Sequence, residues 1–195
     1  MIGTHKEAIQ LLIKECTLGE GDVFLDLGSH LGQELEVLAP MGVEVHSFEP
    51  HPVLFNRLLE NYKECPNVKL NNLAAWNSNE EKHLFFKRNK TEHSDGSTLI
   101  ASKNNINTSI KDLVKCVDIA EYIKNINKPI KVLKIDVEGA EYVILEHLIN
   151  EELIQDIEFI YCEDHERKIN SKSWSEQKKR VINYCNSKNI NIRNW

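Results

Sequence analysis

The segment VLKIDVEGAE, at positions 132–141, constrains the fold of this chain more than any other. It begins as an apolar strand, reaches carboxylates at Asp136 and Glu138, and breaks at Gly139 into a helix. In open α/β sheets, ligands and reacting groups collect where the parallel strands reach their carboxyl ends. The segment therefore predicts an α/β fold with a functional site at the end of this strand.

Strands and helices alternate along most of the chain, at the short spacing of a parallel, doubly wound sheet. Apolar runs predict strands at 23–27, 43–48, 67–70, 130–135 and 157–162. Helical spacing predicts helices at 31–39, 50–62, 119–126, 140–148 and 174–186, after a lead helix that ends near position 19. The chain has 195 residues, which suits a sizeable core, and we expect a single domain over 1–195.

Two further apolar runs, at 83–87 and 114–117, interrupt this rhythm and flank a polar stretch at 89–111. We expect the two runs to pair as a hairpin at the edge of the sheet, joined by a long loop. The loop contains HSDGST at 93–98, which is either a lid over the substrate or an ordinary solvated loop.

Charge and composition exclude several classes of function. The net charge of −6 gives no general attraction to phosphate backbones, so we expect no nucleic-acid partner. The amphipathic N-terminal segment is not a signal peptide, and no apolar run approaches the length of a membrane span. Five scattered cysteines without a CxxC pair predict reduced thiols in a cytoplasmic protein, in the host cytoplasm if the source is viral.

The turn GSHLG at 28–32 follows the first strand, and its glycines allow a sharp bend and a close approach to a ligand. Glu49 follows the next strand, at roughly the twenty-residue offset at which an acid binds the ribose hydroxyls of a nucleoside. An ordinary structural turn is the alternative. His30 and Gln33 depart from the G-x-G-x-x-G pattern, which disfavours the pyrophosphate of NAD. S-adenosylmethionine has no phosphate, and Asp26 is placed to attract its ammonium group.

Three motifs resemble those of the FkbM-type S-adenosylmethionine-dependent methyltransferases: FLDLGSHLG at 24–32, FEP at 48–50 and LKIDVEGAE at 133–141. The resemblance covers about 23–165, and it implies a Rossmann-like class I methyltransferase fold. It also implies the cofactor contacts: Gly28, Ser29, His30 and Gly32 beside the methionine part, Glu49 at the ribose, and Ala74 and Ala75 near adenine; Asp26, Pro50 and Asp136 complete the predicted set. The chain departs from the fold where it ends after one strand at 189–193, so we expect a trimmed C-terminal edge.

The carboxylates after the strand at 130–135 are the candidate reaction site. Lys134 and Asp136 share one face by the period-two alternation of a strand, and Glu138 follows at the turn. A methyl acceptor must lose its hydroxyl proton, and Glu138 or His165 is the candidate general base. The predicted catalytic residues are Lys134, Asp136, Glu138 and His165. Stabilisation of the following helix N-terminus is the alternative role, above all for Glu141.

A second acidic pair, Glu163 and Asp164, follows the strand at 157–162 and is expected beside Asp136. Converging carboxylates repel one another unless they are neutralised, and a divalent cation neutralises them with oxygen ligands. Some antibiotic-sugar O-methyltransferases of similar fold hold magnesium with acids at these two places. We therefore expect Asp136, Glu163 and Asp164 to bind Mg²⁺ or Mn²⁺, with an ion pair to Lys134 as the alternative.

The sequence thus predicts an S-adenosylmethionine-dependent O-methyltransferase that acts on the hydroxyl of a small molecule, with a sugar or glycan as the expected acceptor. Two alternatives remain open: a nicotinamide-dependent oxidoreductase on a similar fold, and a non-catalytic binding module on a methyltransferase scaffold.

Overall fold

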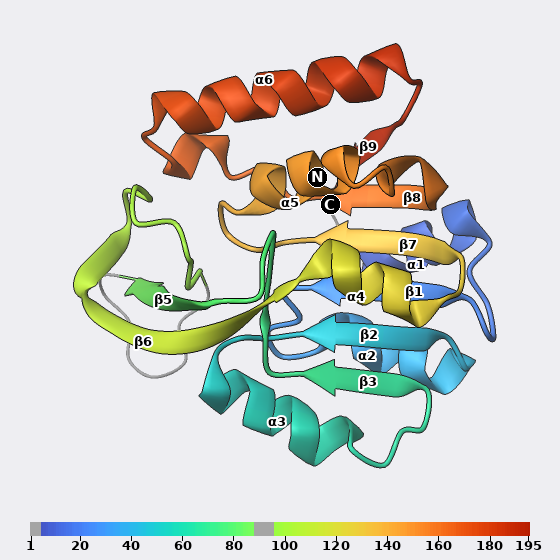
Figure 1. The fold of residues 1–195 in the computed structure, drawn as a ribbon. Coiled ribbons are helices and arrows are strands. Elements are labelled where there is room, and N and C mark those ends of the chain that lie inside the picture. Colours follow the sequence, from blue (N-terminus) through green and yellow to red (C-terminus); the bar gives the residue numbers. More distant parts are fainter. Residues whose placement is uncertain (1–4, 88–95) are drawn as a thin grey trace.

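A parallel sheet of six strands forms the centre of the computed structural model, which describes residues 5–87 and 96–195 (Figure 1). Its order is β3-β2-β1-β7-β8-β9, and each neighbouring pair is parallel. The strands are β1 (Val23–Leu27), β2 (Glu44–Phe48), β3 (Val68–Asn71), β7 (Ile130–Ile135), β8 (Ile157–Cys162) and β9 (Ile192–Asn194). The strand order reverses between β1 and β7, where ligands bind in such folds. This topology confirms the predicted doubly wound, Rossmann-like α/β fold.

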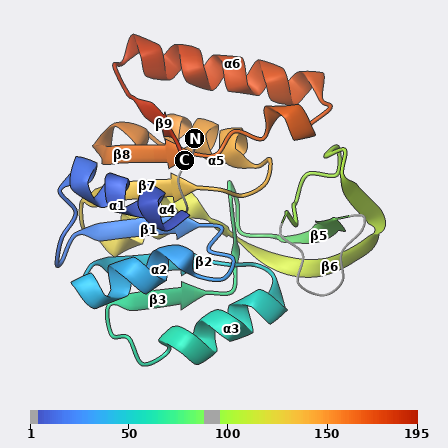
Figure 2. The same ribbon diagram turned by 180° about the vertical axis from the view of Figure 1, so that it is seen from behind.

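Helices cover both faces of the sheet, as the two opposite views show (Figures 1 and 2). α1 (His5–Cys16) and α2 (Gln33–Leu38) lie on one face, while α4 (Ile119–Ile126) and α5 (Glu141–Asn150) lie on the other. α3 (Pro52–Tyr62) lies near β3, and α6 (Lys172–Ser187) packs against α5. Short 3-10 turns span Ala39–Met41, Ile154–Asp156 and Glu166–Lys168. No helix in the described ranges is long and apolar enough to cross a membrane.

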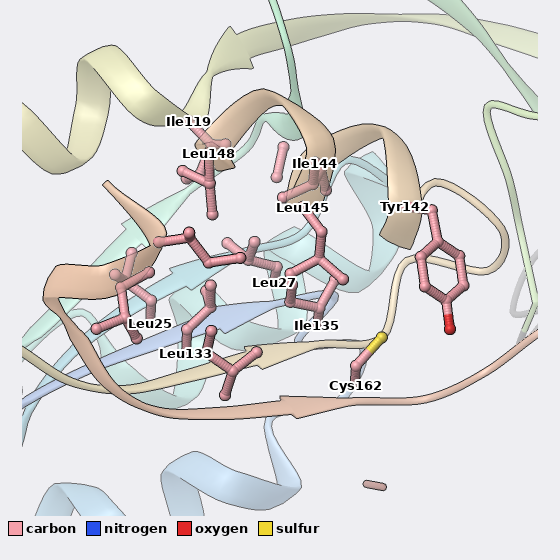
Figure 3. Close-up of a cluster of buried hydrophobic side chains, with 14 of the residues drawn as sticks. Leu25, Leu27, Ile119, Leu133, Ile135, Tyr142, Ile144, Leu145, Leu148 and Cys162 are labelled. Carbon is pink, nitrogen blue, oxygen red and sulfur yellow. The ribbon is translucent and has the colours of Figure 1, made fainter. Parts of the chain in front are cut away.

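The alternation of side chains along β1 and β7 builds a separate core on each face of the sheet. Odd-numbered residues such as Leu25 and Leu133 pack under α5, where Leu145 is fully buried (Figure 3). Even-numbered residues such as Phe24 and Val132 pack under α1 and α2. Because both faces are covered, these strands are mostly apolar, which explains why the sequence predicts them well.

A second, three-stranded sheet lies beyond the carboxyl ends of the central strands (Figures 1 and 2). It consists of β4 (Ala74–Trp76), β5 (Glu81–Lys87) and β6 (Ile106–Asp118), in the order β4-β6-β5. β5 and β6 form the predicted antiparallel hairpin, but the hairpin belongs to this separate sheet rather than to the edge of the central one. β6 also begins inside the stretch that was expected to be a loop. The sequence did not indicate this part of the strand, because residues 108–113 are exposed and show no apolar alternation. Positions 93–95 of the loop lie outside the described residues.

The C-terminal edge of the central sheet is β9, which pairs in parallel with β8. β9 is the last strand in the order of the central sheet on this side. The strand starts at Ile192 rather than at the predicted 189, because Asn189 takes a positive φ of 57° in the turn after α6.

The core under α5 supplies a direct test of this packing. Replacing Leu145, which is 0% exposed, by Ala removes buried methyl groups and leaves a cavity. We expect Leu145→Ala to lower the free energy of unfolding by about 2–5 kcal/mol in urea titrations. The matched control is Leu11→Ala in α1, where the side chain is 68% exposed and the change should stay within about 0.5 kcal/mol. Equal effects of the two substitutions would contradict the described core.

Candidate active site

A cavity of about 580 Å³ opens at the carboxyl ends of β1, β2 and β7, against the second sheet. Most of the residues predicted from the sequence line it: Gly28, Ser29, His30, Glu49, Pro50, Ala74, Ala75, Lys134, Asp136, Glu138 and Glu163. Asp26, Gly32, Asp164 and His165 are not among its lining residues. The structure therefore brings the predicted cofactor turn and most of the predicted reaction site to one cavity.

The turn after β1 depends on a glycine at position 28. Gly28 has a φ of +91°, and a Cβ built there would lie 1.9 Å from the backbone oxygen of Asp136. A side chain would therefore collide with the turn after β7, in addition to straining the backbone. The backbone amides of Gly28 and Ser29 both donate to the carbonyl of Phe48, at 3.0 Å. These contacts hold the ends of β1, β2 and β7 together.

Glu49 lies in the cavity wall and is only 6% exposed. Its carboxylate accepts hydrogen bonds from the backbone amides of His30, at 2.9 Å, and His51, at 2.8 Å. Burial raises the pKa of Glu49 to about 7, although the two amide donors oppose this shift. Since each carboxylate oxygen has a further lone pair, Glu49 can also accept from a pair of ligand hydroxyls.

An apolar wall lies next to Glu49 in the cavity. It is formed by Phe48, Leu54, Ala74, Ala75 and Leu84. Such a surface fits a flat ring such as a purine, as the predicted adenine position at β4 requires. The sequence did not single out Leu54 and Leu84 as site residues, because an apolar residue in a helix or strand has no distinguishing local signal.

Lys134 is buried between two carboxylates on the α2 side of the sheet. Its ammonium nitrogen lies 3.0 Å from Asp26 Oδ1 and 3.3 Å from Glu34 Oε1, and it donates to the carbonyl of Gly28 at 3.0 Å. Burial raises the pKa of Asp26 against the attraction of Lys134. Burial also acts on Glu34, but Lys134 and a hydrogen bond from His5 lower the pKa of Glu34 to about 2.

Lys134 thus offsets part of the negative charge of Asp26 and Glu34. Its predicted catalytic role stays a prediction. Glu34 and His5 both line the cavity and were not predicted from the sequence. In the sequence, Glu34 is indistinguishable from the acids that commonly occupy the first turn of a helix, and His5 lies far from every motif.

Glu138 anchors a distant segment to the rim of the cavity. Its Oε2 lies 2.6 Å from the ammonium of Lys103, whose side chain is fully buried, and 3.3 Å from that of Lys168. The hydroxyl of Thr98 donates to the Glu138 carbonyl at 2.7 Å, and Lys103 donates to the carbonyl of Gly96. Burial opposes ionisation of Glu138, but contacts with His165 and Lys103 hold its pKa below the ordinary value. The segment 96–103 is therefore tied to the turn after β7.

His165 is buried behind the acidic wall of the cavity, and 1% of its surface is exposed. Its Nδ1 lies 2.8 Å from Glu141 Oε1. Its Nε2 lies 3.1 Å from Glu138 Oε2, 3.4 Å from Glu163 Oε1 and 4.0 Å from Asp136 Oδ1, without the alignment of a hydrogen bond to any of them. Burial favours the neutral ring, but the contacts with Glu138 and Glu141 raise the pKa of His165 to about 10.

Asp164, a predicted metal ligand, lies away from this group. Its carboxylate pairs with Lys178 and accepts from the hydroxyl of Tyr142 and the amide of Glu166. Successive residues after a strand point to opposite sides, so Glu163 and Asp164 do not share a site. The described residues that come together as candidate metal ligands are Asp136, Glu163 and His165.

A doubly wound sheet with a glycine turn after β1, a buried acid after β2 and carboxylates after β7 defines the class, a Rossmann-like fold with a candidate ligand site at the carboxyl ends of its strands. The chain belongs to the FkbM methyltransferase family, because the sequence model of the methyltransferase FkbM domain matches residues 26–189. This membership confirms the resemblance seen in the three motifs.

One curated protein with a similar sequence is named for its action on a hexuronic acid. The chain is 27% identical, over 164 residues, to the hexuronic acid methyltransferase AglP of Haloferax volcanii. The alignment covers 83% of this chain and 62% of AglP, so the chain spans about three fifths of that relative's length. No solved structure matches the chain significantly.

The buried Lys134 can be tested through stability. Lys134→Met would leave Asp26 and Glu34 buried without their shared cation, at a cost of about 3–5 kcal/mol in the free energy of unfolding. The matched control is Lys128→Met, which removes a half-exposed pair with Glu44 and should cost less than about 1 kcal/mol. Urea denaturation followed by circular dichroism measures both, and a small loss for Lys134→Met would contradict the described charge network.

Proposed function

We propose that this protein transfers a methyl group from S-adenosylmethionine to a hydroxyl oxygen of a sugar. One observation carries the proposal: a single cavity joins the glycine turn and Glu49 to the carboxylates Asp136 and Glu138. Membership of the FkbM family supports methyl transfer, and the name of AglP supports a sugar acceptor. The family also favours methyl transfer over the nicotinamide-dependent alternative.

The cavity fits S-adenosylmethionine better than a dinucleotide. The absence of a Cβ at Gly28 lets the turn after β7 pack against the turn after β1, and both turns line the cavity together with Glu49, which would accept from the ribose hydroxyls. The wall of the cavity contains five carboxylates, which repel a pyrophosphate and attract a cation: Glu34, Glu49, Asp136, Glu138 and Glu163. When bound, S-adenosylmethionine supplies a methyl group on a positively charged sulfur and also carries an ammonium group.

The carboxylates after β7, at the end of the cavity where the reaction would take place, position the acceptor and receive its proton. Asp136 and Glu138 line the cavity, so either carboxylate is within reach of an acceptor hydroxyl there. The acceptor oxygen gains the methyl group, and its proton passes to one of these carboxylates. Positioning supplies much of the rate, and a general base adds about a hundredfold or more. The choice among Lys134, Asp136, Glu138 and His165 as catalytic residues stays a prediction.

The single domain over 1–195 and the cytoplasmic location also stay predictions. All five cysteines are free, which agrees with the reduced thiols on which the location was based.

Methyl transfer can be assayed with a panel of sugars. We expect release of S-adenosylhomocysteine, and a sugar heavier by one methyl group in mass spectrometry, with at least one neutral sugar or uronic acid. A uronic acid offers both hydroxyl and carboxylate oxygens, and resistance of the product to mild alkali separates an ether from a methyl ester. If the protein binds S-adenosylhomocysteine and turns over no acceptor, the non-catalytic alternative is favoured. If NADH and not S-adenosylhomocysteine raises the melting temperature, the proposal is wrong.

The raised pKa of Glu49 predicts how cofactor affinity depends on pH. Ribose hydroxyls donate to the ionised carboxylate, so binding should strengthen as pH rises through the pKa of about 7. From about pH 6 to about pH 8 the ionised fraction grows roughly tenfold, and the affinity for S-adenosylhomocysteine should grow by about the same factor. Isothermal titration calorimetry measures this affinity.

Glu49→Gln is the control for other titrating groups. This variant should bind S-adenosylhomocysteine more weakly at about pH 8 and lose most of the pH dependence. A wild-type affinity that is constant over this range, or a Glu49→Gln variant with the same pH profile, would refute the assignment of Glu49 to the ribose.

A further inference from the structure

We propose that Asp136, Glu163 and His165 form a binding site for a divalent first-row metal ion at the reaction end of the cavity. One ligand atom of each residue lies within 4.8 Å of the others. Ligand atoms bound to one such ion at about 2.1 Å stand roughly 3–4 Å apart, so small side-chain movements close the site. The existence of the site is independent of the proposed function, whereas its part in catalysis rests on that function.

The orientation of His165 is the second observation behind the site. Glu141, which is 0% exposed, lies 2.8 Å from Nδ1 of the ring. Because an ionised carboxylate only accepts hydrogen bonds, Nδ1 carries a hydrogen, and Nε2 offers its lone pair to a metal ion that displaces the proton there. That Nε2 is buried and without a hydrogen-bond partner, and it lies 3.1 Å from Glu138 Oε2, 3.4 Å from Glu163 Oε1 and 4.0 Å from Asp136 Oδ1. A buried lone pair directed at carboxylates is unfavourable unless a cation lies between them.

Glu141 matches the residue that commonly supports a metal-binding histidine. Such histidines donate their second ring nitrogen to a carboxylate, which fixes the tautomer and the ring orientation. Here the Glu141 carboxylate is itself held by the backbone amide of Gly139, at 2.9 Å. The supporting carboxylate is thus in place before any ion binds.

Two of the three ligands open toward the cavity. Asp136 and Glu163 line it, with 26% and 42% of their side chains exposed, while His165 closes the site from behind. An ion with these three protein ligands has further coordination positions free on the cavity side, as catalytic metal sites do. Those positions are where two neighbouring oxygens of a sugar would be bound and oriented.

The ligand types indicate which ions fit. Two carboxylates alone would suit Mg²⁺ or Ca²⁺, whereas an imidazole nitrogen favours Mn²⁺, Fe²⁺, Co²⁺ or Zn²⁺. The neighbouring acids do not complete an all-oxygen site. Asp164 pairs with Lys178, and Glu138 Oε2 is 2.6 Å from the ammonium of Lys103. The competing explanation is a proton on His165 Nε2 that forms ion pairs with the same carboxylates.

Binding of Mn²⁺ to the full chain tests the site directly. Electron paramagnetic resonance measures free Mn²⁺ in a titration, and we expect about one bound ion per chain for the wild type. Spin-echo modulation should show the coupling of a ¹⁴N nucleus, because His165 supplies a nitrogen ligand. His165→Gln should abolish this coupling and weaken binding at least tenfold, and Glu141→Gln should weaken binding by about 10–100-fold while the coupling remains.

Asp164→Asn is the matched control, since it removes a carboxylate next to His165 without touching the cluster. It should leave both Mn²⁺ affinity and the nitrogen coupling unchanged. The site is refuted if the wild type binds no Mn²⁺, if bound Mn²⁺ shows no nitrogen coupling, or if Asp164→Asn weakens binding as much as His165→Gln. The first two outcomes come from the wild type and do not depend on the folding of any variant.

Calorimetry with S-adenosylhomocysteine, in the presence of a strong chelator, separates this proposal from the proposed function. Binding of S-adenosylhomocysteine by a protein that binds no Mn²⁺ would refute the metal site and leave the proposed function standing. Binding of Mn²⁺ without S-adenosylhomocysteine would support the site and overturn the proposed function.

Discussion

The close contact between the turns after β1 and β7 is the constraint on which the cavity depends. The amide of Asp136 donates to the carbonyl of Leu27 at 2.9 Å, and Gly28 has no Cβ to hold the two turns apart. This contact places the turn that would hold a nucleoside cofactor directly against the carboxylates that would hold an acceptor. Because the donor and acceptor groups of a transfer reaction must lie within bonding reach, this short backbone contact sets the geometry of the site.

Buried charge is concentrated at the end of β7, on both faces of the sheet. On the α2 side, Lys134 lies between Asp26 and Glu34. On the other side, His165 lies among several acids, and Lys103 lies beside Glu138. Buried carboxylates are stable only when they are paired; Lys134 and His165 each face more than one acid, whereas Lys103 pairs with Glu138. The excess of negative charge is what makes the cavity suited to a cationic ligand.

The parts of the site that follow from backbone rules could be predicted from the sequence. Strand ends, a glycine turn and the acid after β2 depend on local patterns, and they place Gly28, Glu49 and Asp136 in one cavity. The partners that depend on contacts distant in sequence could not be predicted in this way. Lys103 lies 35 positions from Glu138, in a stretch with no apolar period. Among the predicted metal ligands, Asp136 and Glu163 come together, whereas Asp164 points away to Lys178.

The acids of the family motif differ in surroundings, and this explains why their spacing matters. Asp136 ends the strand and lines the cavity, whereas Glu138, at a positive φ of 57°, turns toward Lys103 and Lys168. Glu141 lies in the first turn of α5 and is fully buried, where it accepts from the Gly139 amide and contacts His165. Its role at the helix N-terminus, the simpler alternative from the sequence, is therefore compatible with a second role in orienting His165. Moving any of these acids by one residue would rotate its carboxylate away from its present partners.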